Sequence, residues 1–313
     1  MSTNDLAARV LAGERRALAR AMTLVENGTE SGRETLRALY PHTGRAHTVG
    51  ITGAGGVGKS TLTNALAKEY RRRGKLVGIV AVDPTSPFTR GAILGDRIRM
   101  QDLSPDPGVF MRSMATRGAL GGLSATAADA VAVMDAFGKD VILLETVGAG
   151  QDEVEVASAA QTTLVLNTPG AGDDVQTLKA GIMEIADILV VNKGDLPGAD
   201  AVMAQLKALL SISDHTDWLI PIVRVVSSRE EGITELADTI DRHHAYLEAS
   251  GALATNARAR ARHQVLAAAQ AELLRRALHA VGEQGLSDLV NSVAERRVDP
   301  YSAASRLIDV VAR

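Results

Sequence analysis

The chain has 313 residues, and its 34 Lys and Arg nearly balance its 37 Asp and Glu. The formal charge of −3 lacks the positive excess that is typical of proteins that bind nucleic acid or an acidic membrane surface. Apolar residues make up 46% of the chain and charged residues 23%, which is typical of a globular protein. Cysteine is absent, which excludes a disulfide scaffold, a thiolate zinc site and a cysteine nucleophile. No apolar run reaches about 18 residues and the N-terminus lacks an apolar signal core, so we expect a cytoplasmic protein.

Residues 1–45 are predicted to be helical, because Leu6, Val10, Leu18 and Met22 recur at helical spacing among charged residues. From residue 46 to about residue 250, short runs rich in Val, Ile and Leu alternate with amphipathic stretches. Most of the runs are apolar on both faces, which is typical of parallel strands covered by helices on both sides. A ligand is then expected at the carboxyl ends of the strands. The runs cover residues 47–52, 76–83, 109–114, 141–146, 163–168, 188–193 and 220–226.

Residues 251–313 are predicted to form a helical arm, because the strand signal ends there and Ala and Arg dominate the composition. We expect this arm to serve dimerisation or to bind a partner. A helical cap within one chain is the first alternative. A nucleic-acid surface is the second, and the lack of interleaved aromatic residues disfavours it.

Residues 53–60, with the sequence GAGGVGKS, match the pattern G-x-x-x-x-G-K-[S/T] between a buried strand and an amphipathic helix. The glycines let the backbone turn tightly, so that consecutive N–H groups point at one centre, and the helix N-terminus adds its positive dipole end. In the resulting phosphate-binding loop, Lys59 is expected to bridge the β- and γ-phosphates and the Ser60 hydroxyl to ligate Mg²⁺. The predicted nucleotide-binding residues of this loop are Gly53, Ala54, Gly55, Gly56, Val57, Gly58, Lys59, Ser60 and Thr61.

Asn192, Lys193 and Asp195 fit the pattern N-K-x-D directly after an apolar strand. A carboxylate at this place accepts two N–H bonds from guanine, whereas adenine offers neither donor in that geometry. We expect Asn192 to hold the loop and the Lys193 stem to lie over the base, so GTP and GDP are the predicted ligands. Ser227 and Ser228 follow the next strand and are expected to direct a backbone N–H at guanine O6; an ordinary strand-ending serine pair is the alternative.

Three acids are placed to hold a metal ion or the attacking water. Asp83 ends a strand, Asp96 lies in a glycine-bounded stretch, and Glu145 begins E-x-x-G where common GTPases have D-x-x-G. The Gly148 N–H is expected to bond the γ-phosphate, so that loss of this phosphate releases the loop. For each acid, a helix cap or a surface carboxylate is the alternative. The predicted catalytic set is Lys59, Asp83, Asp96, Glu145 and Gly148, and the predicted metal set is Ser60, Asp83, Asp96 and Glu145.

These motifs and the segments around them resemble the MeaB/ArgK family of G proteins, which are chaperones of adenosylcobalamin-dependent methylmalonyl-CoA mutase. The likeness rests on VAVDPTSPFTRGAILGDRIRM and ETVGAGQDEVEV, and also on GAGGVGKSTL, PGAGDDVQTLKAGIMEIADILVVNKGD and DPYSAASRLI. Together these stretches run through the nucleotide-binding region and touch the arm. The chain departs from the family pattern at Gly55, where proline is common, at Arg90, where glycine is common, and at Gly194, where alanine is common.

The resemblance implies an α/β P-loop NTPase fold of the SIMIBI type, with a mostly parallel sheet and helices on both faces. It implies an N-terminal helical segment (1–45), a G domain (46–250) and a C-terminal arm (251–313) that forms a homodimer. Asp83, Asp96 and Glu145 match family acids around Mg²⁺ and the hydrolytic water. Residues that match a switch-like loop transmitting the nucleotide state to the mutase are Asp173, Asp174, Gln176 and Lys179.

The leading hypothesis is therefore a GTPase that gates adenosylcobalamin loading and protects or reactivates the mutase. A chaperone of another acyl-CoA mutase is one alternative. A metal-centre insertase would need His and Cys clusters, and the seven scattered His and the absence of Cys disfavour it. A transport-linked kinase would need a phosphoacceptor protein, which nothing in the sequence indicates.

Overall fold

The computed structural model describes residues 3–83, 101–103, 105–115, 122–146, 158–170, 185–211 and 217–310. Its centre is one sheet of seven parallel strands in the order β3-β2-β4-β1-β5-β6-β7. Every strand falls within or beside a predicted apolar run, which confirms the predicted α/β fold. The strands are β1 (His47–Gly53), β2 (Val77–Asp83), β3 (Val109–Ala115), β4 (Val141–Thr146), β5 (Thr162–Asn167), β6 (Ile188–Val191) and β7 (Ile222–Arg224).

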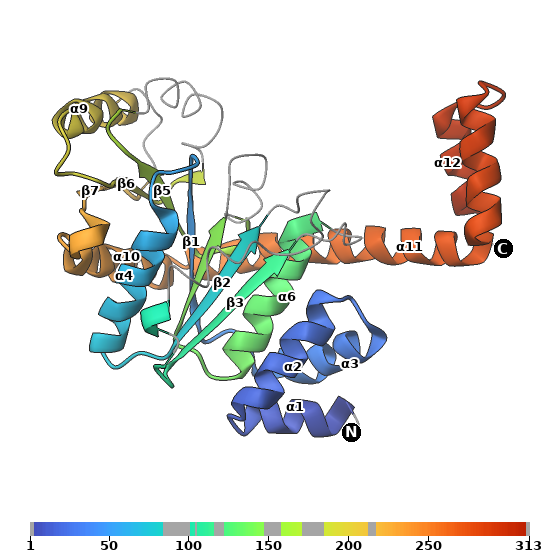
Figure 1. Ribbon diagram of the computed structural model, residues 1–313, viewed down its shortest axis with the longest axis horizontal. Coiled ribbons are helices and arrows are strands. Elements are labelled where there is room, and N and C mark those ends of the chain that lie inside the picture. The colour runs from blue at the N-terminus through green and yellow to red at the C-terminus, as the bar shows by residue number, and fades with distance from the viewer. Residues whose placement is uncertain are drawn as a thin grey trace.

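Helices cover both faces of the sheet (Figure 1). On one face, α4 (Lys59–Arg72) and α10 (Ile233–Ala249) bury the side chains that include Ile51 and Leu143. On the other face, α6 (Gly122–Ala136) and the N-terminal helices bury the alternate side chains, among them Val82 and Leu144. Because neighbouring residues of a strand point to opposite faces, each central strand must be apolar throughout. A third, smaller cluster packs α9 (Ala199–Leu210) against β5 and β6.

Three amphipathic helices precede the sheet: α1 (Thr3–Leu11), α2 (Arg15–Glu26) and α3 (Glu30–Leu39). Their buried side chains join the cluster beneath α6, as the helical spacing of the N-terminal segment predicts. Short 3₁₀ turns lie at η1 (Tyr40–His42), η2 (Gln101–Leu103) and η4 (Ser227–Arg229). None of the helices in the described part of the chain combines the length and the apolar character that a bilayer crossing demands.

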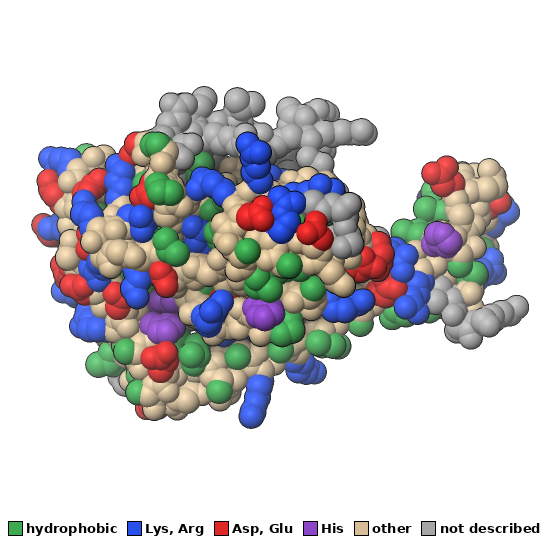
Figure 2. All heavy atoms as spheres, turned by 90° about the horizontal axis from the view of Figure 1, so that it is seen from below, with side chains coloured by type: hydrophobic (Ala, Val, Ile, Leu, Met, Phe, Trp, Pro, Cys, Tyr) green, Lys and Arg blue, Asp and Glu red, His purple; other side chains and the backbone are tan. Residues whose placement is uncertain are grey.

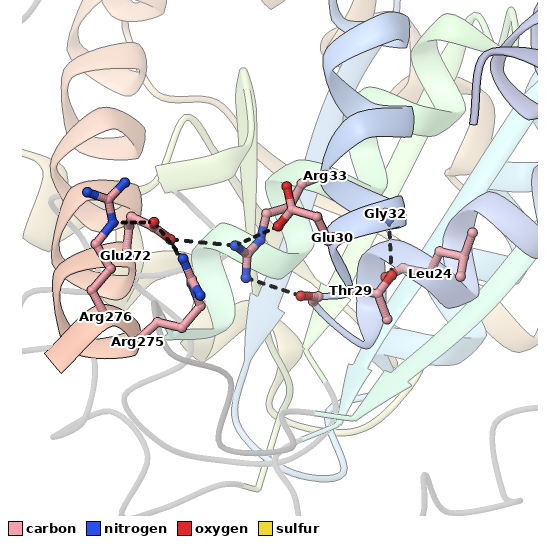
Figure 3. A network of polar contacts seen from close by, with 9 residues as sticks. Leu24, Thr29, Glu30, Gly32, Arg33, Glu272, Arg275 and Arg276 are labelled. Atoms are coloured by element: carbon pink, nitrogen blue, oxygen red, sulfur yellow. Dashed lines mark hydrogen bonds and ion pairs between the residues drawn. The ribbon is translucent and has the colours of Figure 1, made fainter. Parts of the chain in front are cut away.

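The C-terminal segment is a helical arm that extends from the body of the molecule (Figures 1 and 2). It consists of α11 (Ala252–Ala294), which is kinked at Gly282, and α12 (Pro300–Asp309), which packs back against the end of α11. The first half of α11 lies along α10 and α6. An ion pair of 3.5 Å between Arg33 of α3 and Glu272 ties the arm to the N-terminal helices (Figure 3). The division of the chain at residues 45 and 250 stays a prediction.

A polar cluster is buried at the amino end of the sheet, opposite the predicted ligand edge. The Thr162 hydroxyl lies 2.8 Å from Nε2 of His47 and 2.9 Å from Nδ1 of His243, and Nε2 of His243 lies 3.4 Å from Asp187. Burial, with the neighbouring His244 and His243, lowers the pKa of His47 to about 3. Burial likewise lowers the pKa of His243 to about 4 and raises that of Asp187 to about 6. Both histidines are therefore neutral at pH 7.

Candidate nucleotide site

The predicted phosphate-binding loop connects β1, which ends at Gly53, to α4, which begins at Lys59. Gly53 and Gly58 have φ of 140° and 96°, which side-chain-bearing residues rarely adopt. A Cβ added at Gly53 would lie 2.6 Å from the Leu166 carbonyl oxygen, and one at Gly58 would lie 2.5 Å from Nδ2 of Asn192. Both glycines are thus required by the backbone conformation and by close neighbours.

Lys59 is buried and curls back over the loop, with Nζ donating to the carbonyl oxygens of Gly53 at 2.5 Å and Ala54 at 3.0 Å. A Cβ added at Gly55 or at Gly56 would meet no atom of the described residues within 4 Å, so the loop is open at these two positions. A cationic amine, a helix N-terminus and an open turn of backbone fit the charge and shape of a nucleotide phosphate chain.

Asn192 joins the phosphate loop to the loop after β7. The Asn192 side chain is 2% exposed, and its Nδ2 donates to the Val57 carbonyl oxygen at 2.8 Å. Its Oδ1 accepts from the Ser227 backbone N–H at 3.2 Å and from the Ser227 hydroxyl at 2.8 Å. One buried amide therefore fixes the relative position of three segments that are far apart in the sequence.

Lys193 and Asp195 follow on the same loop. Lys193 has a φ of 53°, and its Nζ donates to the Gly56 carbonyl oxygen at 3.0 Å, which lays its stem alongside the phosphate loop. Oδ2 of Asp195 lies 3.0 Å from Nη2 of Arg229, the last residue of η4. The predicted guanine-binding residues are thus brought together with the phosphate loop at one edge of the sheet.

Gly194 departs from the alanine common in the resembling family, and the structure gives a local reason. A Cβ at Gly194 would lie 2.4 Å from Cγ of Arg224, whose guanidinium pairs with Asp200 at 2.6 Å. The Arg224 stem occupies the space that an alanine methyl would take.

Glu145, near the end of β4, is fully buried between β1 and β2, where its backbone lies opposite Ile51 and Ala81. One of its carboxylate oxygens, Oε2, accepts a short hydrogen bond from the Thr63 hydroxyl of α4. Asp83 closes β2 two strands from the phosphate loop, and its backbone position is all that is described. Glu145 and the backbone of Asp83 therefore both lie at the carboxyl edge of the sheet.

Buried hydroxyl groups lie near the carboxyl ends of four strands. In the part of the chain that the structure describes, the side-chain oxygens of Thr52, Ser113, Thr146 and Thr168 are buried without a hydrogen-bond partner. Buried polar atoms normally have partners, so this edge has a capacity for hydrogen bonds that the described residues do not use. Such a donor and acceptor set is compatible with a hydrated Mg²⁺ ion.

Six predicted residues lie outside the described part of the chain: Asp96, Gly148, Asp173, Asp174, Gln176 and Lys179. Two residues that contact the site were not predicted from the sequence. Thr63 follows Lys59 by one helical turn, so helical spacing places it on the same face and provides a signal. Arg229 directly follows the serine pair, and no pattern distinguishes it from other surface arginines.

The chain was compared with known proteins. The family model "Methylmalonyl Co-A mutase-associated GTPase MeaB" matches residues 18–282. A protein of Pyrococcus abyssi named as a GTPase is 47% identical over 309 residues, covering 97% of this chain and 95% of that one. The GTPase ArgK of Escherichia coli is 37% identical over 254 residues, covering 78% and 77%. The mitochondrial methylmalonic aciduria type A homolog of Mus musculus is 34% identical over 272 residues, covering 81% and 65%.

Among solved structures, that of the LAO/AO transport system kinase has a TM-score of 0.71 at 25% identity, and the match covers 99% of this chain and 98% of that one. These matches confirm the resemblance, and with it guanine nucleotide binding. The phosphate loop and the N-K-x-D loop lie together at the predicted ligand edge of the sheet. The chain therefore belongs to the MeaB family and is a GTPase.

Proposed function

We propose that this GTPase is a chaperone of adenosylcobalamin-dependent methylmalonyl-CoA mutase, in which the nucleotide state gates cofactor loading and protects or reactivates the mutase. The observation that carries the proposal is the match of residues 18–282 to a family described as methylmalonyl-CoA mutase-associated. Relatives named for methylmalonic aciduria and as GTPases support it. A chaperone of another acyl-CoA mutase is the alternative, and the test below includes it.

In this proposal one loop would bind the phosphates of GTP and a second set of loop residues would bind the guanine base. The backbone N–H groups of residues 54–60 would bind the phosphates, and Lys59 would leave its carbonyl partners to contact the β- and γ-oxygens. The Asp195 carboxylate would accept the guanine N1–H and exocyclic amine. Because the Ser227 N–H already donates to Asn192, we assign the guanine O6 contact to Ser228.

Mg²⁺ would be held by the Ser60 hydroxyl and, through water, by Asp83, Asp96 and Glu145, and it would neutralise charge that builds up on the phosphates. The backbone of Glu145 is fixed by two flanking strands, and its carboxylate would accept a hydrogen bond from a metal-bound water. Gly148 would bond the γ-phosphate. We assign transmission of the nucleotide state to the mutase to Asp173, Asp174, Gln176 and Lys179.

We further propose that the arm forms a homodimer with a second copy of the chain. Large apolar side chains are exposed along α11 and α12, among them Val265 (67%), Leu273 (54%), Val290 (57%) and Tyr301 (87%). Figure 2 shows such side chains distributed among charged ones on the projecting arm. Leu273→Asp should shift the sedimentation coefficient to that of a monomer. The matched control Leu219→Asp changes a 76% exposed leucine of the body and should leave the dimer intact.

The client assignment is tested by measuring GTP turnover with and without purified methylmalonyl-CoA mutase. Turnover should be slow alone, because no arginine finger is recognisable in the sequence, and should rise when the mutase is added. Isobutyryl- and ethylmalonyl-CoA mutases are run in parallel, and stimulation by one of these instead would transfer the assignment to it. Unchanged turnover with every mutase refutes the chaperone proposal. Transfer of labelled γ-phosphate to protein rather than to water would instead support a kinase.

A further inference from the structure

The Thr63 hydroxyl reaches the Glu145 carboxylate beneath the phosphate loop. Both side chains are fully buried, and the residues are 82 positions apart in the sequence. The same hydroxyl lies 3.0 Å from the Lys59 carbonyl oxygen, one turn earlier in α4. A hydroxyl has one proton, so it donates to only one of these acceptors at a time. An ionised carboxylate is a stronger acceptor than a backbone carbonyl oxygen, so the bond to Glu145 is favoured when its carboxyl group is ionised.

Glu145 needs such a contact because of its length. Its backbone is held on both sides by the parallel ladders to β1 and β2, so only its side-chain torsions remain to be fixed. Compared with the aspartate of D-x-x-G, glutamate has one more methylene and one more torsion, and ordering that torsion costs conformational entropy. A bond to one carboxylate oxygen sets the direction of the other.

We propose that Thr63 is a positioning residue for GTP hydrolysis, which orients the Glu145 carboxylate toward the metal-bound water. Thr63 follows Lys59 by four residues and Ser60 by three, so it lies next to each of them on the surface of α4. A single rigid helix then fixes the phosphate-binding amine, the metal-binding hydroxyl and the support for Glu145. This inference rests on the role proposed above for Glu145.

The test compares Thr63→Val, which keeps the shape and removes the hydroxyl, with a matched control, Thr35→Val. Thr35 is also fully buried in a helix, and its hydroxyl donates to the carbonyl four residues earlier at 2.7 Å, but it contacts no carboxylate among the described residues. Steady-state GTP hydrolysis is measured over a Mg²⁺ titration, and GDP binding is measured by calorimetry with and without Mg²⁺. For Thr63→Val we expect kcat to fall about 10- to 100-fold, with the KM for GTP within about threefold of the wild-type value. Adding Mg²⁺ should also raise the GDP affinity of this variant less than that of wild type. Thr35→Val should retain the wild-type kcat.

Thr63→Ser supplies the second variant, because serine keeps the donor and loses only a methyl group. A kcat within about twofold of wild type supports the role of the hydroxyl, and a loss as large as that of valine overturns it. Equal kcat and equal Mg²⁺ dependence in Thr63→Val and Thr35→Val also overturn it. Glu145→Gln distinguishes failure of the proposed role of Glu145 from failure of the inference on Thr63. Wild-type hydrolysis by this variant refutes the proposed role of Glu145 itself. A loss in Glu145→Gln without a loss in Thr63→Val refutes the inference on Thr63 alone.

Discussion

Replacing Asn192 with alanine should destabilise the protein and separate the phosphate loop from the base-reading loops. The variant removes three hydrogen bonds, to the Val57 carbonyl and to the N–H and hydroxyl of Ser227, at a side chain that is 2% exposed. Each such bond contributes a net ~1 kcal/mol, so the free energy of unfolding should fall by about 3 kcal/mol. Asn167→Ala is the matched control, since Asn167 is also buried but within the described residues its side chain makes one long bond, of 3.4 Å, to the Val165 carbonyl oxygen.

The assay is urea unfolding of the nucleotide-free proteins followed by circular dichroism, combined with calorimetric binding of GDP and of inorganic tripolyphosphate. Asn192→Ala should be less stable than Asn167→Ala by about 2 kcal/mol. It should also bind tripolyphosphate more weakly than wild type, although this ligand has no base, because Asn192 holds the Val57 end of the phosphate loop. Equal stability of the two variants, or wild-type affinity for tripolyphosphate, would refute the reasoning.

Three further outcomes are expected. Gly58→Ala forces a Cβ to within 2.5 Å of Nδ2 of Asn192 at a φ of 96°, so GDP affinity measured by calorimetry should fall by at least about tenfold. Asp195→Asn should lower GDP affinity by about 100-fold or more and favour xanthosine diphosphate, whose C2 oxygen accepts from an amide; retained guanine preference would contradict the assignment. The imidazole of His47 has its pKa lowered to about 3 in the folded chain, from 6.5, so below pH 6.5 the unfolded state binds a proton that the folded state does not. The free energy of unfolding should therefore decrease from pH 6.5 toward pH 4, and His47→Gln should flatten this dependence in urea titrations; an unchanged slope would argue against a neutral buried His47.

The fold could be predicted from the sequence because its signals are local. An apolar run that ends in a glycine-rich loop or an acid predicts a buried parallel strand, and β1 and β4 follow this pattern. The conformation of residues 53–58 follows from glycines that tolerate positive φ. The order of the strands was not predicted, since parallel strands carry no local information about their neighbours.

Long-range side-chain pairs explain what the sequence did not reveal about the site. The contact of Thr63 with Glu145 and the pairing of Arg229 with Asp195 depend on how α4, β4 and η4 come together in space. His47 was treated only as the first residue of a strand run, yet its environment is set by α10, which lies almost 200 residues later in the chain. Tertiary packing, and not local pattern, decides these contacts.

The kink at Gly282 divides α11 into a straight shaft and a short end segment that pairs with α12 (Figure 1). At a rise of about 1.5 Å per residue, the shaft from Ala252 to the kink is about 46 Å long. The contacts with α10 and α6 and the ion pair of Glu272 with Arg33 hold most of this shaft against the body, so only the last ten residues before the kink, about 15 Å, extend beyond Glu272. A rearrangement of α3 or α6 would therefore be passed to the shaft and would change the direction in which the tip points.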